Sequence, residues 1–138
     1  LEGEEALVVY ATHTYPQLFF GDEGFRDRNR ALTEGLPNDI ESLGGAHVIV
    51  VGDLNATMWS PAYQGLVDKA ALRSARKGFG VCPTLGRVES WSLLRAVPAD
   101  HCLISTGIAV HSFRTGPFLG SDHLPIVTEL SYPRNESE

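Results

Sequence analysis

The stretch VGDLNATMWSP, residues 51–61, follows an apolar run and turns abruptly polar. The run Val48–Val51 is typical of a buried strand. Asp53 and Asn55 are residue types that bond their own backbone in turns, and Gly52 lets the strand turn sharply because it tolerates a positive φ. These residues fit an ordinary turn and a ligand site at a strand end equally well, so the choice between the two depends on the rest of the chain.

The segments around this stretch predict strands alternating with helices. A strand is expected at residues 6–13 and another at residues 46–51. Between them, a helix is expected over residues 22–36, and Pro37 and Asn38 should end it before a short helical turn up to Leu43. Its N-cap should be Asp22, and its apolar stripe Phe25, Leu32 and Leu36.

The second half of the chain predicts one more helix and three strands. Ser60 as N-cap and Pro61 as first residue begin a helix that runs to about Ala71. Residues 77–99 are rich in Gly, Pro and Ser, which is typical of a long functional loop. Residues 101–105, 108–113 and 124–130 should pair antiparallel, with a turn at Gly107. We expect one α/β domain of the α+β type over residues 1–132, with a mixed, largely antiparallel sheet, flanking helices and a disordered tail at residues 133–138.

The composition of the chain limits the classes of function that it can have. The chain has 138 residues, 43% of them hydrophobic, and a formal net charge of −6, which disfavours a protein that only binds nucleic acid. No apolar run is long enough to cross a bilayer, and no signal peptide is visible, so this chain should make no membrane contact of its own. The two cysteines, Cys82 and Cys102, form no CxxC pair; two free thiols and one disulfide both remain open.

Polar side chains stand at the ends of four predicted strands. Ligands of α/β sheets bind where strand ends converge, so these residues should lie close together. Carboxylates bind Mg²⁺ or Mn²⁺, a carboxylate can deprotonate water, and an imidazolium can stabilise charge on phosphate oxygens. Each residue alone also has an ordinary structural interpretation, but the set suits phosphate-ester cleavage. It comprises His13, Asp53, Asn55, Asp100, His101, Ser121, Asp122 and His123.

Four motifs in this order resemble the endonuclease/exonuclease/phosphatase superfamily, which has the DNase I-like fold. They are ATHTYP (11–16), VGDLNATMWSP (51–61), ADHCLIS (99–105) and GSDHLPIV (120–127). Family domains are near twice this length and form two stacked sheets, so the resemblance implies the C-terminal half of such a domain. The family's N-terminal Asn and main metal-binding Glu then lie upstream.

The resemblance also implies a role for each site residue. His13 touches the scissile phosphate, and Asn55 binds it through its amide. Asp53 orients or deprotonates the attacking water or protonates the leaving oxygen, and with Asp122 it is a candidate ligand of Mg²⁺ or Mn²⁺. His123 is the catalytic histidine and Asp100 the acid that pairs with it. Two further histidines match no such role and are expected to be surface or strand residues: His101 and His111.

The resemblance extends to partners and location. The substrate would be a phosphate ester: a nucleic acid, a lipid head group or a small phosphodiester. Residues 56–86 resemble a bacterial branch in which a membrane-spanning region often precedes the catalytic domain, and the chain begins without Met, so we expect a soluble fragment of a membrane-anchored bacterial protein. The sheet face left open by the missing half predicts a homodimer.

Three interpretations follow. The first is a divalent-metal-dependent phosphoesterase that cleaves monoesters or diesters. The second is a catalytically incomplete binding or sensor domain of a bacterial membrane protein. The third, a purely structural α/β domain, requires all four strand-end clusters to be accidents.

Overall fold

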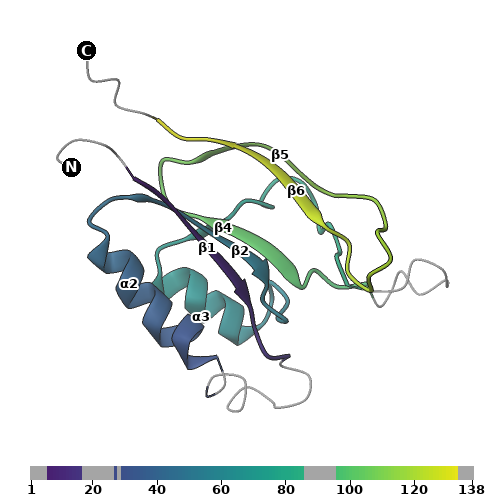
Figure 1. Cartoon of the computed structure of the whole chain (residues 1–138), viewed down its shortest axis with the longest axis horizontal. Helices are drawn as coiled ribbons and strands as arrows, with labels where there is room; N and C mark the ends of the chain where they lie inside the picture. Colours follow the sequence, from purple (N-terminus) through teal and green to yellow (C-terminus); the bar gives the residue numbers. More distant parts are fainter. Residues whose placement is uncertain (1–5, 17–26, 28, 86–95, 134–138) are drawn as a thin grey trace.

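The described part of the chain consists of two sheets, with helices packed against one of them (Figure 1). The computed structural model describes residues 6–16, 27, 29–85 and 96–133. The helices cover one face of the larger sheet, and the smaller sheet lies over its other face. This arrangement confirms the predicted α+β class. The elements in chain order are β1 (Leu7–His13), the π-helix η2 (Ala31–Gly35), α2 (Leu36–Ser42), β2 (His47–Asp53), α3 (Pro61–Lys69), β3 (Arg73–Ser74), β4 (Asp100–Ile104), β5 (Ala109–Thr115) and β6 (Ile126–Ser131).

The larger sheet has the strand order β1-β2-β4-β3. β1 runs parallel to β2, and β4 runs antiparallel to both β2 and β3. The register pairs His13 with Asp53, and Asp53 with Asp100. Three of the predicted site residues therefore lie side by side at one end of this sheet.

The predicted pairing of the last three strands is correct only for β5 and β6. These two strands form a separate antiparallel sheet, whereas β4 belongs to the larger sheet. β4 has buried apolar residues on both faces, because Leu103 and Ile104 are fully buried in opposite core clusters. A strand with two apolar faces is stable only between two layers, which is the position that β4 takes.

The helix before β2 differs from the sequence prediction. Pro37 was expected to end it, but η2 continues directly into α2, and Pro37 stands in the first turn of α2. Proline is tolerated there because the first N–H groups of a helix have no intrahelical partner. Leu32 and Leu36 are buried as predicted. The predicted start of the helix, with Asp22 and Phe25, lies outside the described residues.

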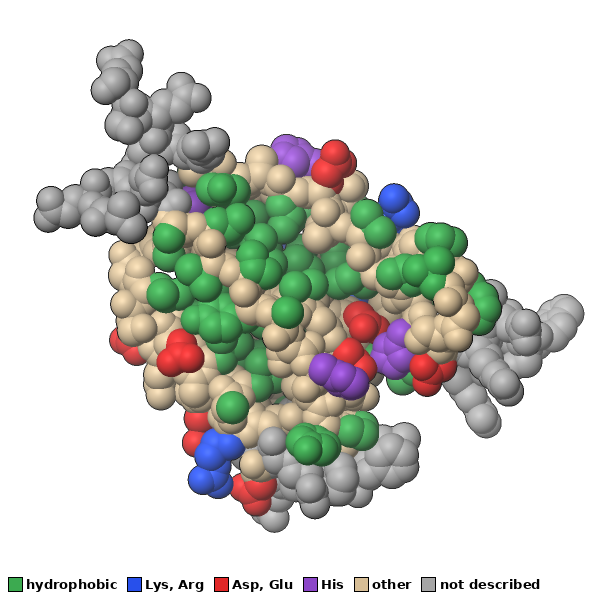
Figure 2. Space-filling view, in the orientation of Figure 1, with side chains coloured by type: hydrophobic (Ala, Val, Ile, Leu, Met, Phe, Trp, Pro, Cys, Tyr) green, Lys and Arg blue, Asp and Glu red, His purple; other side chains and the backbone are tan. Residues whose placement is uncertain are grey.

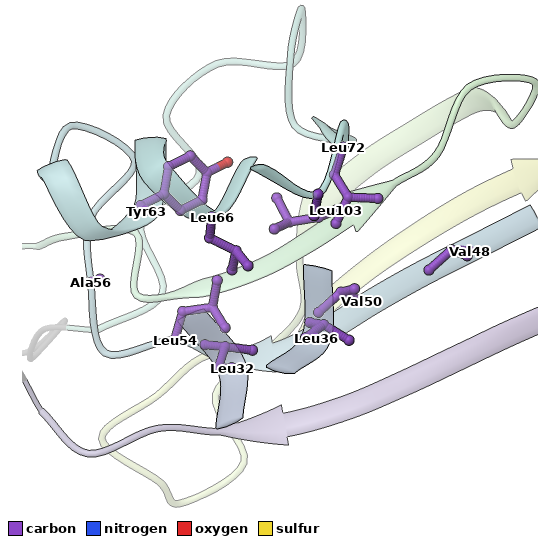
Figure 3. Packing of buried hydrophobic residues seen from close by; sticks show 11 residues of the cluster. Leu32, Leu36, Val48, Val50, Leu54, Ala56, Tyr63, Leu66, Leu72 and Leu103 are labelled. Atoms are coloured by element: carbon purple, nitrogen blue, oxygen red, sulfur yellow. The ribbon is translucent and has the colours of Figure 1, made fainter. Parts of the chain in front are cut away.

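The core between the helices and the larger sheet confirms the second helix prediction (Figure 3). Ser60 caps α3 by accepting a hydrogen bond at Oγ from the Tyr63 N–H, at 3.2 Å, and Pro61 is the first residue. Leu66 of α3 then packs in the same cluster as Leu103 of β4. This packing fixes the loop between β2 and α3, which carries Asn55.

A second core cluster joins the two sheets. It includes Cys102 and Ile104 of β4 and Phe113 of β5. Cys102 is buried and Cys82 partly buried, and both are free thiols, which settles the question that the sequence left open.

The predicted long loop is partly ordered by short pairings. β3 precedes it, and Leu85 forms isolated bridges with Val97 and His123. Residues 86–95 of the predicted loop and 134–138 of the predicted tail lie outside the described residues. Among the residues that the structure describes, no helix combines the length and apolarity needed to cross a membrane.

Candidate active site

The end of the larger sheet gathers acidic and histidine side chains from three strands. His13 is the last residue of β1, Asp53 the last of β2 and Asp100 the first of β4. Figure 2 shows these acidic and imidazole groups close together on one face of the molecule. The antiparallel entry of β4 explains how residues 53 and 100, distant in the sequence, become neighbours.

Gly52 acts by close approach rather than by turning the strand. β2 continues through it to Asp53, so the sharp turn expected at Gly52 is absent. A Cβ at this position would lie 1.9 Å from the Thr12 carbonyl oxygen of β1, and its φ of +144° is one that side chains disfavour. The turn comes at Asn55, whose φ is +45°.

Asn55 holds the carboxylate of Asp53 in place. Its backbone N–H donates to Asp53 Oδ1 at 2.8 Å, and its side-chain amide donates to Asp53 Oδ2 at 3.1 Å. The same amide donates to the carbonyl oxygen of Thr14 at 2.8 Å. An amide nitrogen has two hydrogens, so donation to a phosphate requires one of these two bonds to open.

His123 lies between the two carboxylates. Its Nδ1 hydrogen-bonds Asp100 Oδ2 at 2.8 Å, and its Nε2 lies 3.8 Å from Asp53 Oδ2. His13 approaches the same Asp53 oxygen from β1, with its Nε2 at 3.5 Å. The Asp53 carboxylate is therefore flanked by two imidazoles, of which His13 is the more exposed.

The environment shifts the pKa values of Asp53 and His123. Burial raises the pKa of Asp53; its hydrogen bond from the Asn55 N–H opposes this rise, and the charge of Asp100 adds to it. Burial alone would lower the pKa of His123. The hydrogen bond to Asp100, together with the charges of Asp100, Asp53 and Asp122, outweighs burial and raises it. A carboxylate with a raised pKa is a better base, and an imidazole with a raised pKa is more often a proton donor at neutral pH.

The donor set suits a hard divalent cation. Oxygen and nitrogen atoms of Asp53, Asp100 and His123 all lie within 4.8 Å of one another. Carboxylates are ligands for Mg²⁺ and Mn²⁺, and Mn²⁺ also accepts imidazole. Asp122, the other predicted metal ligand, is exposed and does not belong to this group in the described part of the chain. Its charge nevertheless acts on His123, so it lies near the site.

Three buried polar residues lie behind the site, and sequence reasoning missed the first two of them: Arg76, Thr84 and His101. His101 lies in a strand, as expected, but it is buried at 1% exposure, whereas His111 is exposed. The His101 Nε2 donates to the Ala56 carbonyl at 2.8 Å, and its Nδ1 accepts from the Arg76 guanidinium at 3.1 Å. Strand alternation was the available signal for His101, because its neighbour Asp100 faces the site. No sequence pattern marks Arg76 or Thr84.

The sequence profile of the Endonuclease/Exonuclease/phosphatase family matches residues 7–123 of the chain. No curated protein sequence matches it. Among solved structures, an endonuclease/exonuclease/phosphatase family protein from Bacteroides thetaiotaomicron is similar, with a TM-score of 0.61 and 19% identity over 73% of this chain and 43% of that one.

Two phosphatases of known structure have a similar fold. A 3′ phosphatase from Neisseria, solved with a product DNA hairpin, aligns with a TM-score of 0.62 and 19% identity over 80% of this chain and 54% of that one. A mannosyl-6-phosphatase from Bacteroides thetaiotaomicron aligns with a TM-score of 0.64 and 16% identity over 91% of this chain and 51% of that one. The chain thus spans about half the length of these solved structures.

Proposed function

Since the chain belongs to the endonuclease/exonuclease/phosphatase family, we propose that it carries the hydrolytic site of a divalent-metal-dependent phosphoesterase. One observation carries the proposal: His123 is held at Nδ1 by Asp100, at 2.8 Å, and presents Nε2 toward the Asp53 carboxylate, at 3.8 Å. An acid-bound imidazole beside a carboxylate of raised pKa forms an acid–base pair of the kind that ester hydrolysis needs.

In this proposal, Asp53 takes a proton from water as the water oxygen attacks phosphorus. The ester P–O bond opposite breaks, and the imidazolium of His123 gives its Nε2 proton to the leaving oxygen or stabilises the charge that develops there. Asp100 fixes the ring orientation by accepting a hydrogen bond from the His123 Nδ1–H. His13, exposed beside Asp53, contacts a phosphate oxygen, and Asn55 binds phosphate after giving up one of its present bonds.

We propose that Asp53, which belongs to the clustered donor set, holds the ion, and that Asp122, whose negative charge acts on His123, is its second ligand. Bound there, Mg²⁺ or Mn²⁺ would neutralise charge on the phosphate oxygens. The two carboxylates are oxygen donors, which both ions accept.

The substrate class is a phosphate ester from a nucleic acid, a lipid head group or a small phosphodiester. Four exposed, largely apolar side chains project from loops that adjoin the strand ends carrying the site residues. They are Tyr15, Trp59, Phe118 and Leu119, with exposed fractions of 55, 63, 65 and 73%. The exposed Trp59 is available to contact a base, a sugar or an acyl chain.

The experiment that tests the function is hydrolysis of a chromogenic phosphodiester, a phosphomonoester and plasmid DNA with Mg²⁺, with Mn²⁺ and with EDTA. We expect turnover that EDTA abolishes and that His123→Ala lowers by a factor of about 10² to 10⁴. The matched control is His111→Ala, because His111 is an exposed strand histidine bonded to Ser131 and remote from the catalytic carboxylates. Activity that survives His123→Ala, or that EDTA leaves unchanged, contradicts the proposal.

A second candidate function is a binding or sensor domain without turnover. The observation that favours it is the chain's coverage of about half of the solved structures that it resembles. Calorimetry that detects Mn²⁺ and phosphate binding to a chain without hydrolytic activity would select this function. That the chain is the extramembrane part of a bacterial membrane-anchored protein stays a prediction from residues 56–86.

We also propose a homodimer through the outer face of β1 and β6. Leu7 and Val9 of β1 and Val127 of β6 are exposed at 38, 55 and 39%, and β1 is an edge strand of its sheet. Figure 2 shows apolar side chains across this part of the surface. Sedimentation should give a dimer that Val9→Lys dissociates; a monomeric parent chain contradicts the proposal.

A further inference from the structure

Asp100 lies in the part of β4 that extends beyond its pairing with β3. The two strands pair only at Arg73↔Ile104 and Ser74↔Leu103. One further backbone bond, from the Ala75 N–H to the Cys102 carbonyl at 2.9 Å, continues the ladder. In a strand the N–H and C=O of one residue point to the same side, so both backbone groups of Asp100 face the edge that β3 has left.

Two buried side chains take the place of the missing strand. The Arg76 guanidinium donates to the Asp100 carbonyl at 2.6 Å. The Thr84 hydroxyl oxygen accepts the N–H groups of Asp100 and Ala99, at 3.0 and 3.1 Å. Arg76 and Thr84 are 2% and 1% exposed, so water does not compete for these bonds.

Thr84 also holds the segment that carries His123. Its carbonyl accepts the Leu124 N–H at 2.7 Å, and its neighbour Leu85 forms a bridge with His123. The Thr84 side chain thus binds the backbone of Asp100, and the Thr84 main chain binds Leu124, which follows His123. Displacing Thr84 would move the two partners relative to each other.

Arg76 is fixed from several sides. It donates to the Nδ1 of His101 at 3.1 Å, and its guanidinium lies 5.0 Å from the centre of the Phe113 ring. Among the described residues, the hydrogen bonds of the Arg76 guanidinium go to the Asp100 carbonyl and the His101 imidazole. Burying this cation is costly, and the cost is offset by these bonds and by the negative charge of Asp100, so the Arg76 guanidinium is held in one place beside Asp100.

We infer that Arg76 and Thr84 are positioning residues that hold Asp100 in hydrogen-bonding reach of His123. Neither touches the proposed reacting atoms. The inference rests on the proposed function of Asp100 and His123, and it extends that function to two residues outside the catalytic cluster.

The test is the downfield NMR resonance of the His123 Nδ1 proton, recorded on this chain and assigned by its loss in Asp100→Asn. Thr84→Val keeps the side-chain volume and removes the acceptor, whereas Thr84→Ser keeps the acceptor. Arg76→Met removes the donor to the Asp100 carbonyl. Thr33→Val is the control, because Thr33 is also buried but donates to a carbonyl in the helical region. Circular dichroism establishes which variants are folded.

We expect the resonance in the parent chain, in Thr84→Ser and in Thr33→Val, and its loss in Thr84→Val and Arg76→Met. In an active chain, kcat should fall about tenfold or more in the last two variants at unchanged KM. Should Thr84→Val fail to fold, the presence or absence of the resonance in Arg76→Met tests the inference. Retention of the resonance in both folded variants, or a failure of serine to restore it, overturns the inference. An inactive parent chain with an intact resonance contradicts the proposed function alone.

Discussion

Lowering the pH from 7 to 5 should cost the fold about 2 kcal/mol of unfolding free energy through His101 alone. The pKa of this imidazole is lowered from 6.5 to about 4, mainly by burial and further by the nearby Arg76 charge, against the opposing effect of the hydrogen bond to the Ala56 carbonyl. Its two ring nitrogens are both hydrogen-bonded in the neutral form: Nε2 donates to Ala56, and Nδ1 accepts from Arg76. A second ring proton would face the Arg76 donor.

The sign of the effect follows from which state binds more protons. Between pH 6.5 and about 4 the unfolded chain protonates this histidine and the folded chain does not. The stability that His101 contributes is therefore complete above pH 6.5 and is lost as the pH falls toward 4. At pH 5 the difference in protonation amounts to about 2 kcal/mol, and at pH 7 to only about 0.2 kcal/mol.

Two other groups act in the opposite direction. The raised pKa of His123 gives stability that is present below its unfolded pKa and is lost as the pH rises through its folded pKa. The raised pKa of Asp53 likewise favours the folded state on acidification. A measurement on the parent chain alone would mix these contributions, so the His101 contribution has to be isolated by a variant.

The assay is urea unfolding followed by circular dichroism at pH 7 and pH 5, for the parent chain, His101→Gln and His111→Gln. Glutamine keeps an N–H donor for the Ala56 carbonyl and does not titrate. The parent chain and His111→Gln should lose about 2 kcal/mol more than His101→Gln on acidification. An equal loss in the parent chain and His101→Gln would refute the reasoning, because it would mean that the buried imidazole is not kept neutral.

Three further substitutions probe the fold that supports the site. Gly52→Ala should destabilise the chain by more than about 3 kcal/mol in urea unfolding, because its Cβ would lie 1.9 Å from the Thr12 carbonyl oxygen; a smaller cost would mean that β1 can move away. Ser60→Ala should lower the free energy of unfolding by about 1 kcal/mol, because the α3 cap is lost. Ser60→Asp should leave the stability nearly unchanged, because its carboxylate can accept the same hydrogen bond. Leu103→Ala should cost about 2 to 5 kcal/mol, since Leu103 is fully buried in the helix-side core, and thermal unfolding at an unchanged midpoint would contradict that packing.

The sequence predicted which polar residues lie close together better than it predicted the strand order. His13, Asp53, Asp100 and His123 could be identified because each stands at the boundary of an apolar run, and polar residues at strand ends converge at a sheet edge. The helix α3 could be predicted because Ser60 and Pro61 give a local start signal. Such signals operate within one turn or one strand.

Most of the errors concern contacts between distant segments. Short connections and Gly107 predicted that residues 101–105 would pair with residues 108–113, but β4 joins β2. The local signal could not show that both faces of β4 need covering. Pro37 gave a stop signal that holds for a helix interior, and the structure places it in a first turn instead. The roles of Arg76 and Thr84 depend on where β3 ends, which no local pattern reveals.

The pairing of His123 with Asp100 depends on both sheets. Asp100 begins β4 of the larger sheet, whereas His123 precedes β6 of the smaller one. Residues 84 and 85 join the two, through the bonds of Thr84 to Asp100 and Leu124 and the bridge of Leu85 to His123. The His123–Asp100 hydrogen bond should therefore be sensitive to any change that lets the sheets shift, even one that leaves the helix-side core intact. The geometry of the Asp100–His123 pair and the stability of the helix-side core should thus be separable, because different contacts maintain them.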